Sequence, residues 1–299
     1  MSTKILNLSD AHKAEDTLNI SKFLSTKGTP KKTRITISNP ITKEIYGVYE
    51  NKVVISGAMY TGCRLFGIHE PDIIPNYDQE LGIENPVSPG AFPPEPGDDD
   101  YVAPELVSLF CVGDSGCGST ESDVKVANFI DRISPKTNAS GIYEDIIPFR
   151  YLTPTEDEEF TSMGNRDMYF GRKVVGLGED QRIMYFFKKF ETTPQLFLKY
   201  ADGTAITPQL YNFSTNQDAD CYVEMELLIN SLDLKEYFDR KKGWNNARFS
   251  TISLCSAWVR KIGNYNYYQN IYPYTKLNFP FIRLIEAEQA VQFNYAIFY

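Results

Sequence analysis

The sequence predicts a mainly β protein, with an antiparallel sandwich or barrel-like core, a few short helices and a long proline-rich arm. Several segments alternate apolar and polar residues between turn signals, which is the pattern of half-buried strands. Aromatic residues make up 14% of the 299-residue chain, and nearly all of them are Tyr and Phe, which favour strands. A chain of this length forms one large or two modest domains, and buries a core without disulfides.

The N-terminal part begins with an arm and continues into a hairpin. Residues 1–30 are polar, and we expect an arm or a short helix there. Residues 33–38 alternate, Asn39-Pro40 begins a turn, and residues 44–49 return as a second strand. Residues 31–70 are therefore predicted to be a β-hairpin module.

A proline-rich segment follows at residues 71–105. Eight of the 17 prolines lie between Pro71 and Pro104, together with the acidic run at residues 98–100. Because proline fixes φ and lacks an N–H, neither a central strand nor a helix is expected. We predict an arm that wraps a neighbouring subunit, with Pro93 and Pro94 as candidate contacts, and simple disorder is the alternative.

Residues 106–299 are predicted to form the main β-rich domain. The strands expected in it cover residues 106–112, 146–151, 182–190, 195–200, 221–229, 249–259 and 291–299. Residues 154–168 are expected to be an acidic loop. Residues 233–242 read as a short helix that Gly243 stops, with Leu234, Tyr237 and Phe238 facing inward.

The C-terminal residues 291–299 alternate to the last position of the chain. A terminal strand must be paired to be ordered. Phe293, Tyr295 and Tyr299 are therefore candidate contacts with neighbouring chains.

A cluster of tyrosines precedes this strand. It contains Tyr265, Tyr267, Tyr268, Tyr272 and Tyr274. Tyrosine rings can stack single-stranded bases, but that use is normally accompanied by a positive groove, and few cations lie near. We interpret the cluster as a protein–protein contact, because Tyr is enriched in interfaces. A sheet partly covered by its own loops explains it equally well.

Charge and cysteine content narrow the possible functions. A net charge of −9 argues against binding nucleic acid through its phosphates, although it suits a wall past which DNA slides. The five cysteines lack a C-x-x-C pair and the chain has two histidines, so we expect buried free thiols and no metal or cofactor. No signal-peptide core or membrane span is found, and we expect a soluble protein made in the cytoplasm of a cell, without membrane contact.

One motif resembles a catalytic site. Residues 113–116 match the nucleophile motif of trypsin-like serine proteases, with Ser115 as the nucleophile. That mechanism needs a histidine base, and neither His12 nor His69 has the expected context. We expect no enzymatic activity, and predict a tight turn in which glycines adopt positive φ at 113, 116 and 118. A redox pair of Cys111 and Cys117 lacks a nearby base or cation.

Several segments together resemble virion structural proteins of large contractile-tailed bacteriophages. These segments are residues 39–44, 51–57, 109–118, 147–151, 169–173, 202–204 and 276–280. The resemblance implies a neck or head–tail connector subunit in a ring, located in the virion. Its partners would be copies of itself and the portal, neck or tail proteins, with DNA passing without sequence recognition. The alternatives are a tail or baseplate component that binds host glycans, and a hydrolase built on Ser115.

Overall fold

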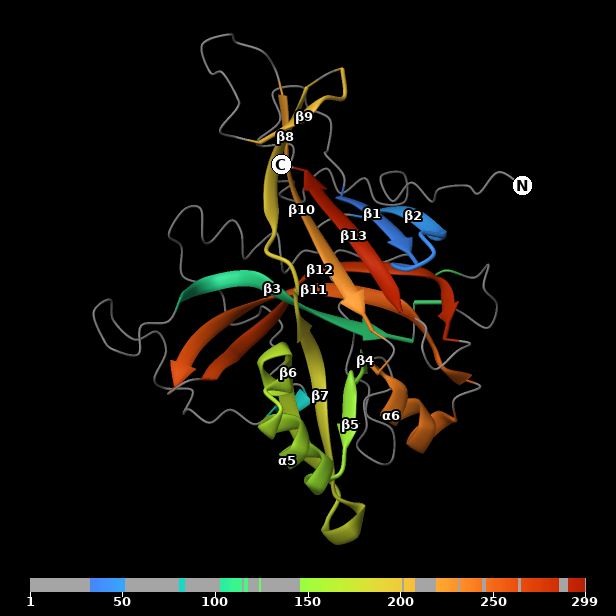
Figure 1. The fold of residues 1–299 in the computed structure, drawn as a ribbon, viewed down its shortest axis with the longest axis vertical. Coiled ribbons are helices and arrows are strands. Elements are labelled where there is room, and N and C mark those ends of the chain that lie inside the picture. Colours follow the sequence, from blue (N-terminus) through green and yellow to red (C-terminus); the bar gives the residue numbers. More distant parts are fainter. Residues whose placement is uncertain are drawn as a thin grey trace, which may run out of the picture.

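The computed structural model describes twelve stretches of the chain. They are residues 33–51, 81–83, 103–114, 116–117, 124, 146–200, 202–207, 219–230, 232–243, 246–262, 265–284 and 290–298. Within them the chain is mainly β, with antiparallel pairing throughout two sheets and a few short helices (Figure 1). The predicted fold class is confirmed. The expectations for residues 1–30 and for most of the proline-rich segment, residues 71–80 and 84–102, lie outside the described residues.

The first sheet has six strands in the order β2-β1-β13-β10-β8-β9. These are β1 (Thr33–Ser38), β2 (Ile45–Asn51), β8 (Gln195–Tyr200), β9 (Ala205–Ile206), β10 (Ala219–Ile229) and β13 (Val291–Phe298). The predicted hairpin of β1 and β2 is confirmed, and the Asn39 side-chain oxygen accepts hydrogen bonds from two amides of its turn. In Figure 1 the end formed by β8 and β9 projects beyond the rest of the described chain.

The second sheet crosses beneath the first. Its order is β12-β11-β3-β7-β5, with β4 paired to β3 and β6 paired to β7. The strands are β3 (Ala103–Gly113), β4 (Ile146–Ile147), β5 (Arg150–Leu152), β6 (Tyr169–Val175), β7 (Arg182–Lys189), β11 (Arg248–Ile262) and β12 (Tyr265–Arg283). The strand expected at residues 146–151 is split into β4 and β5 around Pro148, which has no N–H to pair.

Strand β12 contains two prolines, which sequence reasoning would normally exclude from a strand. β12 lies at the end of its sheet, so only β11 needs its backbone groups. The pairing of the two strands also shifts register beside Pro273 and around Pro280. An edge position and bulges thus allow β12 to run for 19 residues.

The acidic loop expected at residues 154–168 is wrong, because residues Pro154–Ser162 form a helix, α5. Thr153 caps the helix by accepting from the Glu156 amide, and the Glu156 carboxylate accepts from the Thr153 amide. Pro154 occupies the first helical position, where its missing N–H costs nothing. A short 3-10 turn at Asn165–Met168 follows the helix.

The second helical segment is confirmed in its main features. It consists of α6 (Lys235–Tyr237) and one π-helical turn, Phe238–Lys242. Leu234, Tyr237 and Phe238 are buried, as predicted, and Gly243 ends the segment with a φ of 78°.

No helix in the described part of the chain is both long and apolar enough to cross a bilayer.

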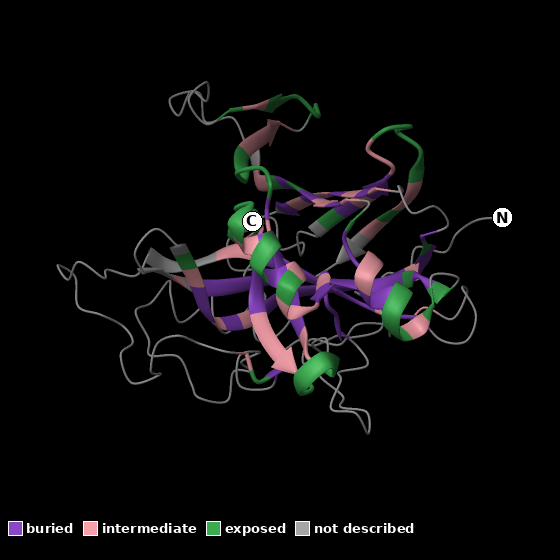
Figure 2. Ribbon diagram, turned by 60° about the horizontal axis from the view of Figure 1, so that its bottom comes forward, coloured by how far each residue is buried: buried purple, intermediate pink, exposed green. Residues whose placement is uncertain are grey.

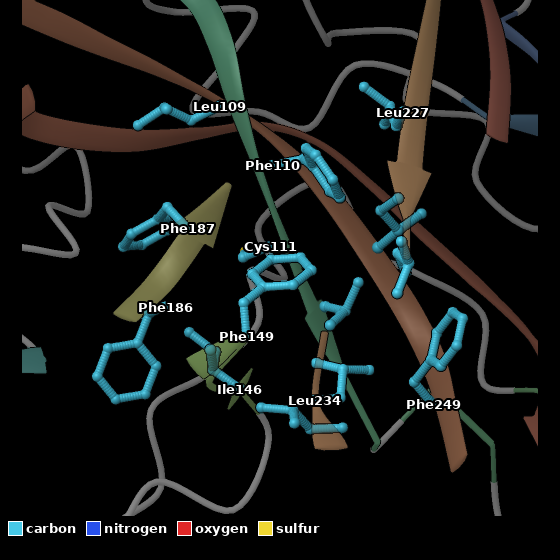
Figure 3. Close-up of a cluster of buried hydrophobic side chains, with 14 of the residues drawn as sticks. Leu109, Phe110, Cys111, Ile146, Phe149, Phe186, Phe187, Leu227, Leu234 and Phe249 are labelled. Atoms are coloured by element: carbon cyan, nitrogen blue, oxygen red, sulfur yellow. The ribbon is translucent and has the colours of Figure 1, made fainter. Parts of the chain in front are cut away.

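The inner faces of the two sheets pack on aromatic side chains. Phe293 of β13 lies 6.1 Å from Phe249 of β11 and 5.8 Å from Phe279 of β12, measured between ring centroids. Buried residues fill the centre of the molecule, whereas exposed residues gather at turns and on helices (Figure 2). Figure 3 shows the same interior continuing past Phe110 and Phe149 toward Leu234. One core therefore joins both sheets and the second helical segment.

Candidate functional site

A cavity of about 370 Å³ lies where β6, α5, the 3-10 turn after α5 and the start of β12 meet. We call it the tyrosine–arginine cavity. Its walls consist of Ile83, Asp157, Arg166, Tyr169, Phe170, Gly171, Arg172, Tyr185, Asn266, Tyr267 and Tyr268. The volume is in the lower part of the range found for ligand-binding pockets.

Gly171 allows β6 to form one wall of the cavity. Its φ is +70°, a conformation that side chains disfavour, and a Cβ there would lie 2.4 Å from the Phe187 ring. The next residue, Arg172, pairs with Tyr185 of β7 and lines the cavity. The close approach of β6 to Phe187 therefore needs glycine at this position.

Asp157 of α5 holds two of the lining side chains in place. One carboxylate oxygen accepts from the Tyr185 hydroxyl at 2.7 Å, and the other accepts from the Arg172 guanidinium at 3.2 Å. The Asp157 side chain is only 12% exposed. Because a buried carboxylate is costly without hydrogen-bond donors, Asp157 needs both Tyr185 and Arg172. Because the capped helix positions Asp157, the missed helix is also the reason that sequence reasoning missed this site.

The opposite wall comes from β12 and from the turn after α5. The Arg166 guanidinium lies 5.7 Å from the centre of the Tyr267 ring, a cation–π contact. The Tyr268 ring lies 4.1 Å from that of Phe170, measured between centroids, and we call this pair of cavity-lining rings the aromatic floor. Two guanidinium groups thus face a cavity whose floor is aromatic.

Beneath the cavity lies a second set of polar contacts, which we call the charged network. The Asp233 carboxylate accepts from the Tyr169 hydroxyl at 2.6 Å and from the Lys188 ammonium at 2.9 Å. The side chains of Lys188 and Asp233 are 1% and 0% exposed. The Lys188 ammonium also donates to the Leu228 carbonyl at 2.8 Å, so the buried cation has several acceptors.

The tyrosines of the site act as neutral hydrogen-bond donors. Burial, followed by the charge and hydrogen bond of Asp233, raises the pKa of Tyr169 above its ordinary value. Burial and the hydrogen bond to Asp157 raise the pKa of Tyr185 in the same way. Neither phenol is therefore suited to act as a base near neutral pH. With two arginines and one carboxylate, the cavity is suited to binding an anionic group.

The structure separates the tyrosine cluster into different environments. Tyr267 and Tyr268 line the cavity, and Tyr272 is half-buried along β12. Tyr274 is 5% exposed and belongs to the core. Tyr265 pairs with Ile262 through its backbone. The cluster is therefore no continuous surface stripe along the described part of β12.

The remaining candidate contacts lie in the core or outside the described residues. Phe293 and Tyr295 are both 0% exposed. β13 pairs with β1 on one side and β10 on the other, so the C-terminal strand finds its partners within its own chain. Phe293 and Tyr295 consequently pack the interior instead of meeting a neighbour. Pro93, Pro94 and Tyr299 lie outside the described residues.

The protease-like motif sits at the end of β3. Neither Gly113 nor Gly116 has a positive φ, which corrects the expectation for these two glycines. Gly116 is needed for space, since a Cβ there would lie 2.0 Å from the Ser250 carbonyl oxygen, and its amide donates to the Ser250 hydroxyl. Asp114 forms an ion pair with Lys242. Ser115, Gly118 and both histidines lie outside the described residues.

The described cysteines are free thiols, and three of the four are buried, as expected. Cys111 lies 3.9 Å from Cys255, measured between the sulfurs, so its thiol neighbour is Cys255 of β11. Burial raises the pKa of Cys111 well above its usual value and disfavours the reactive thiolate. Within the described ranges no group of three or more His, Cys, Asp or Glu side chains could hold a metal ion.

Exposed apolar side chains mark both ends of the six-stranded sheet. At one end, Ile45 and Val48 of β2 are 62% and 43% exposed, and Ile41 in the adjoining turn is 78% exposed. At the other end, Leu196 of β8 is 45% exposed. Large apolar residues are thus open to solvent where this sheet has unpaired edges among the described strands.

The comparisons with known proteins find no relatives. No family model matches the chain, and neither the curated proteins nor the solved structures give a significant match.

Proposed function

We propose that this chain is a structural subunit of a tailed-bacteriophage virion, a neck or head–tail connector component that forms a ring through protein–protein contacts. The phage assignment rests on the sequence resemblance. Several of the resembling segments are scaffold elements, such as the β1–β2 turn, β3 and the region of β12 around Pro280. Similarity along strands and turns is expected of proteins that share an architecture.

The observation that carries the proposed assembly role is the apolar exposure at both ends of the six-stranded sheet. An open edge strand with exposed apolar side chains readily pairs with another chain. Ile45 and Val48 lie on such a strand, because β2 ends the described sheet. A neighbouring subunit that covers β2 would remove this surface from water and pair its backbone.

A test of self-assembly compares the wild-type chain with an edge variant. Mass photometry and negative-stain electron microscopy of the purified full chain should show rings of several copies. Ile45→Asp combined with Val48→Asp places two charges on the edge and should shift the population toward single chains. Met163→Asp is the matched control, because Met163 is 73% exposed beyond the end of α5. A wild-type chain that stays monomeric at every concentration would contradict the assembly role.

The position in the particle needs a separate experiment. Immunogold labelling of purified virions that contain the chain should place the label at the head–tail junction. Label on the capsid shell or the distal tail would exclude a connector. Absence of the chain from particles would overturn the virion assignment altogether.

A further inference from the structure

The turn between β6 and β7 is a rigid, exposed projection, which we call the β6–β7 turn (residues 176–181). Leu177 at its tip is 88% exposed, and Glu179 and Asp180 follow it, also exposed. In Figure 1 this turn stands at the lower end of the described chain, below α5. An isolated leucine this exposed, next to two carboxylates, is a surface that a partner could bury.

Hydrogen bonds hold the β6–β7 turn in one shape. The Arg182 guanidinium donates to the Glu179 carbonyl at 2.8 Å and to the Gln181 carbonyl at 2.6 Å. The Asp180 amide donates to the Leu177 carbonyl at 3.2 Å. Gly176 has a φ of +78°, and a Cβ there would lie 2.5 Å from the Asp180 carbonyl oxygen. A turn that is ordered before binding loses little conformational entropy in a contact.

The tyrosine–arginine cavity has the complementary chemistry. Arg166 and Arg172 can each donate to a carboxylate, while Phe170 and Tyr268 offer apolar surface at the floor. Both oxygens of Asp157 already accept hydrogen bonds from side chains within the cavity. A cavity of about 150 Å³ can hold benzene, so about 370 Å³ leaves room for a leucine side chain and a carboxylate.

We propose that the β6–β7 turn of one copy of this chain inserts into the tyrosine–arginine cavity of the next copy. Leu177 would meet the aromatic floor, and Glu179 and Asp180 would meet the two arginines. The turn cannot reach the cavity of its own chain, because the five residues from Arg172 to Leu177 separate them by roughly 17 Å along β6. This inference rests on the proposed self-association and names a further pair of surfaces for it, in addition to the edge at β2.

In the proposed contact each copy gives its turn to one neighbour and its cavity to another, so the contact is head-to-tail. Such a heterologous interface produces a ring when the rotation between copies closes, and a filament when it does not. A ring is the arrangement expected of the proposed connector. The contact uses surfaces separate from the edge at β2, so both can contribute to the same assembly.

Two sets of variants of the full chain test the contact from each side. Glu179→Lys with Asp180→Lys reverses the charge of the turn, and Arg166→Glu reverses that of the cavity. Each should weaken self-association in sedimentation velocity by about tenfold or more, since like charges then face each other. Arg166 is chosen over Arg172 because Arg172 supports the buried Asp157. Circular dichroism checks that each variant is folded, and Arg166→Gln provides a milder second variant of the cavity.

Mixing the two variants gives the sharpest result. Neither variant alone offers both an intact turn and an intact cavity. An equimolar mixture contains the intact cavity of the turn variant and the intact turn of the cavity variant, so a mixed dimer should form. A contact through an unrelated surface would give no such recovery.

The controls use residues of the same kind at other places. Leu177→Asp should disrupt assembly, whereas Leu232→Asp should not, although Leu232 is 58% exposed. Glu226→Lys on β10, where the side chain is exposed, is the control for charge.

The outcomes separate this contact from the assembly role itself. Turn and cavity variants that assemble like the wild type would overturn this contact and leave the proposed function standing. A monomeric wild type would overturn both. Calorimetric titration with glucuronate tests a competing occupant. One result would assign the cavity to an acidic sugar instead: glucuronate binds the wild type, Arg166→Gln abolishes that binding, and the turn variants assemble like the wild type.

Discussion

The interior of the molecule is built in two ways. Between the two sheets, the rings of Phe249, Phe279 and Phe293 pack against one another. Where the end of β7 meets the segment before α6, the charged network places Lys188 and Asp233 out of reach of water. Both regions belong to one continuous cluster of buried residues, yet they respond to different kinds of change.

The difference lies in what each region needs from its neighbours. Apolar packing has no fixed partner, so its free energy depends on volume and shape. A buried charge depends on a particular partner, and removing that partner leaves the charge without compensation. Substitutions can therefore test two expectations. Side-chain volume should matter more in the apolar packing, and charge and hydrogen-bond partners should matter more in the charged network.

The largest effect is expected in the charged network. Asp233→Ala should lower the free energy of unfolding by about 3 kcal/mol, because it removes one of the two carboxylates paired with the buried Lys188 ammonium, Glu191 being the other, together with an acceptor of the Tyr169 hydroxyl. Lys188→Met should cost less, since Asp233 keeps donors in the Tyr169 hydroxyl and the Asn230 amide. Urea unfolding of both variants measures the two values. Equal losses would show that the network is not organised around Asp233.

Beside the apolar core, where Gly116 at the end of β3 packs against β11 of the same sheet, an added methyl group should be the damaging change. Gly116→Ala should cost about 3 kcal/mol, because its Cβ would lie 2.0 Å from a backbone oxygen of Ser250. Gly164→Ala is the control, because its φ is +74° but nothing lies within 4 Å of the added Cβ. It should cost about 1 kcal/mol from backbone conformation alone. Similar losses in urea unfolding would mean that space at Gly116 is not limiting.

A smaller effect is expected at the start of α5, where a polar partner lies nearer the surface. Thr153→Ala removes the hydroxyl that accepts from the Glu156 amide and should cost about 1 kcal/mol. Thr161→Ala in the last turn of the same helix removes a hydroxyl without a capping role, and should be nearly neutral. Thermal unfolding compares the two. A loss confined to Thr161→Ala would contradict the assigned cap.

The smallest effect is a dependence on pH. Two hydrogen bonds from Arg240 lower the pKa of Glu156 from 4.5 to about 2. Because the folded pKa is the lower one, this pair stabilises the protein fully above pH 4.5, and the contribution disappears as pH falls toward 2. Glu156 is 40% exposed, so solvent screens the pair and the change is small.

This dependence is measured as a difference between two proteins. Urea unfolding of the wild type and of Glu156→Gln should differ at pH 6, and the difference should shrink at pH 3. A difference that grows on acidification would reverse the sign of the assigned shift.

Much of the strand structure could be predicted from the sequence. The alternation in β10 correctly predicts that Met225 and Leu227 face the core while Glu224 and Glu226 face solvent. The pattern of α5 is weaker, because its buried residues are Asp157 and Phe160 and one of these is charged. The signal that could have identified this helix was the capping sequence at Thr153 and Glu156.

The candidate site was harder to predict than the fold. The sequence predicts Tyr267 and Tyr268 as contact residues, and both line the cavity, but it indicates neither Arg166 nor Arg172. Arg166 and Arg172 lie in segments without a functional motif. Their importance depends on neighbours about 100 positions away in β12, which no local pattern indicates.

By itself, the sequence determined most of the strands, where the main turns fall and that the chain is mainly β, whereas β6 and the proline-containing β12 were not predicted. These properties follow from the side-chain period along a strand and from the chemistry of Gly, Pro and Asn in turns. Only the tertiary structure decided that β13 finds both partners within its own chain and that Cys111 meets Cys255, 144 positions away. A local pattern reports which face of a strand is apolar, but not which distant strand will cover it. Register and sheet order, set by the packing of the whole chain, made that choice.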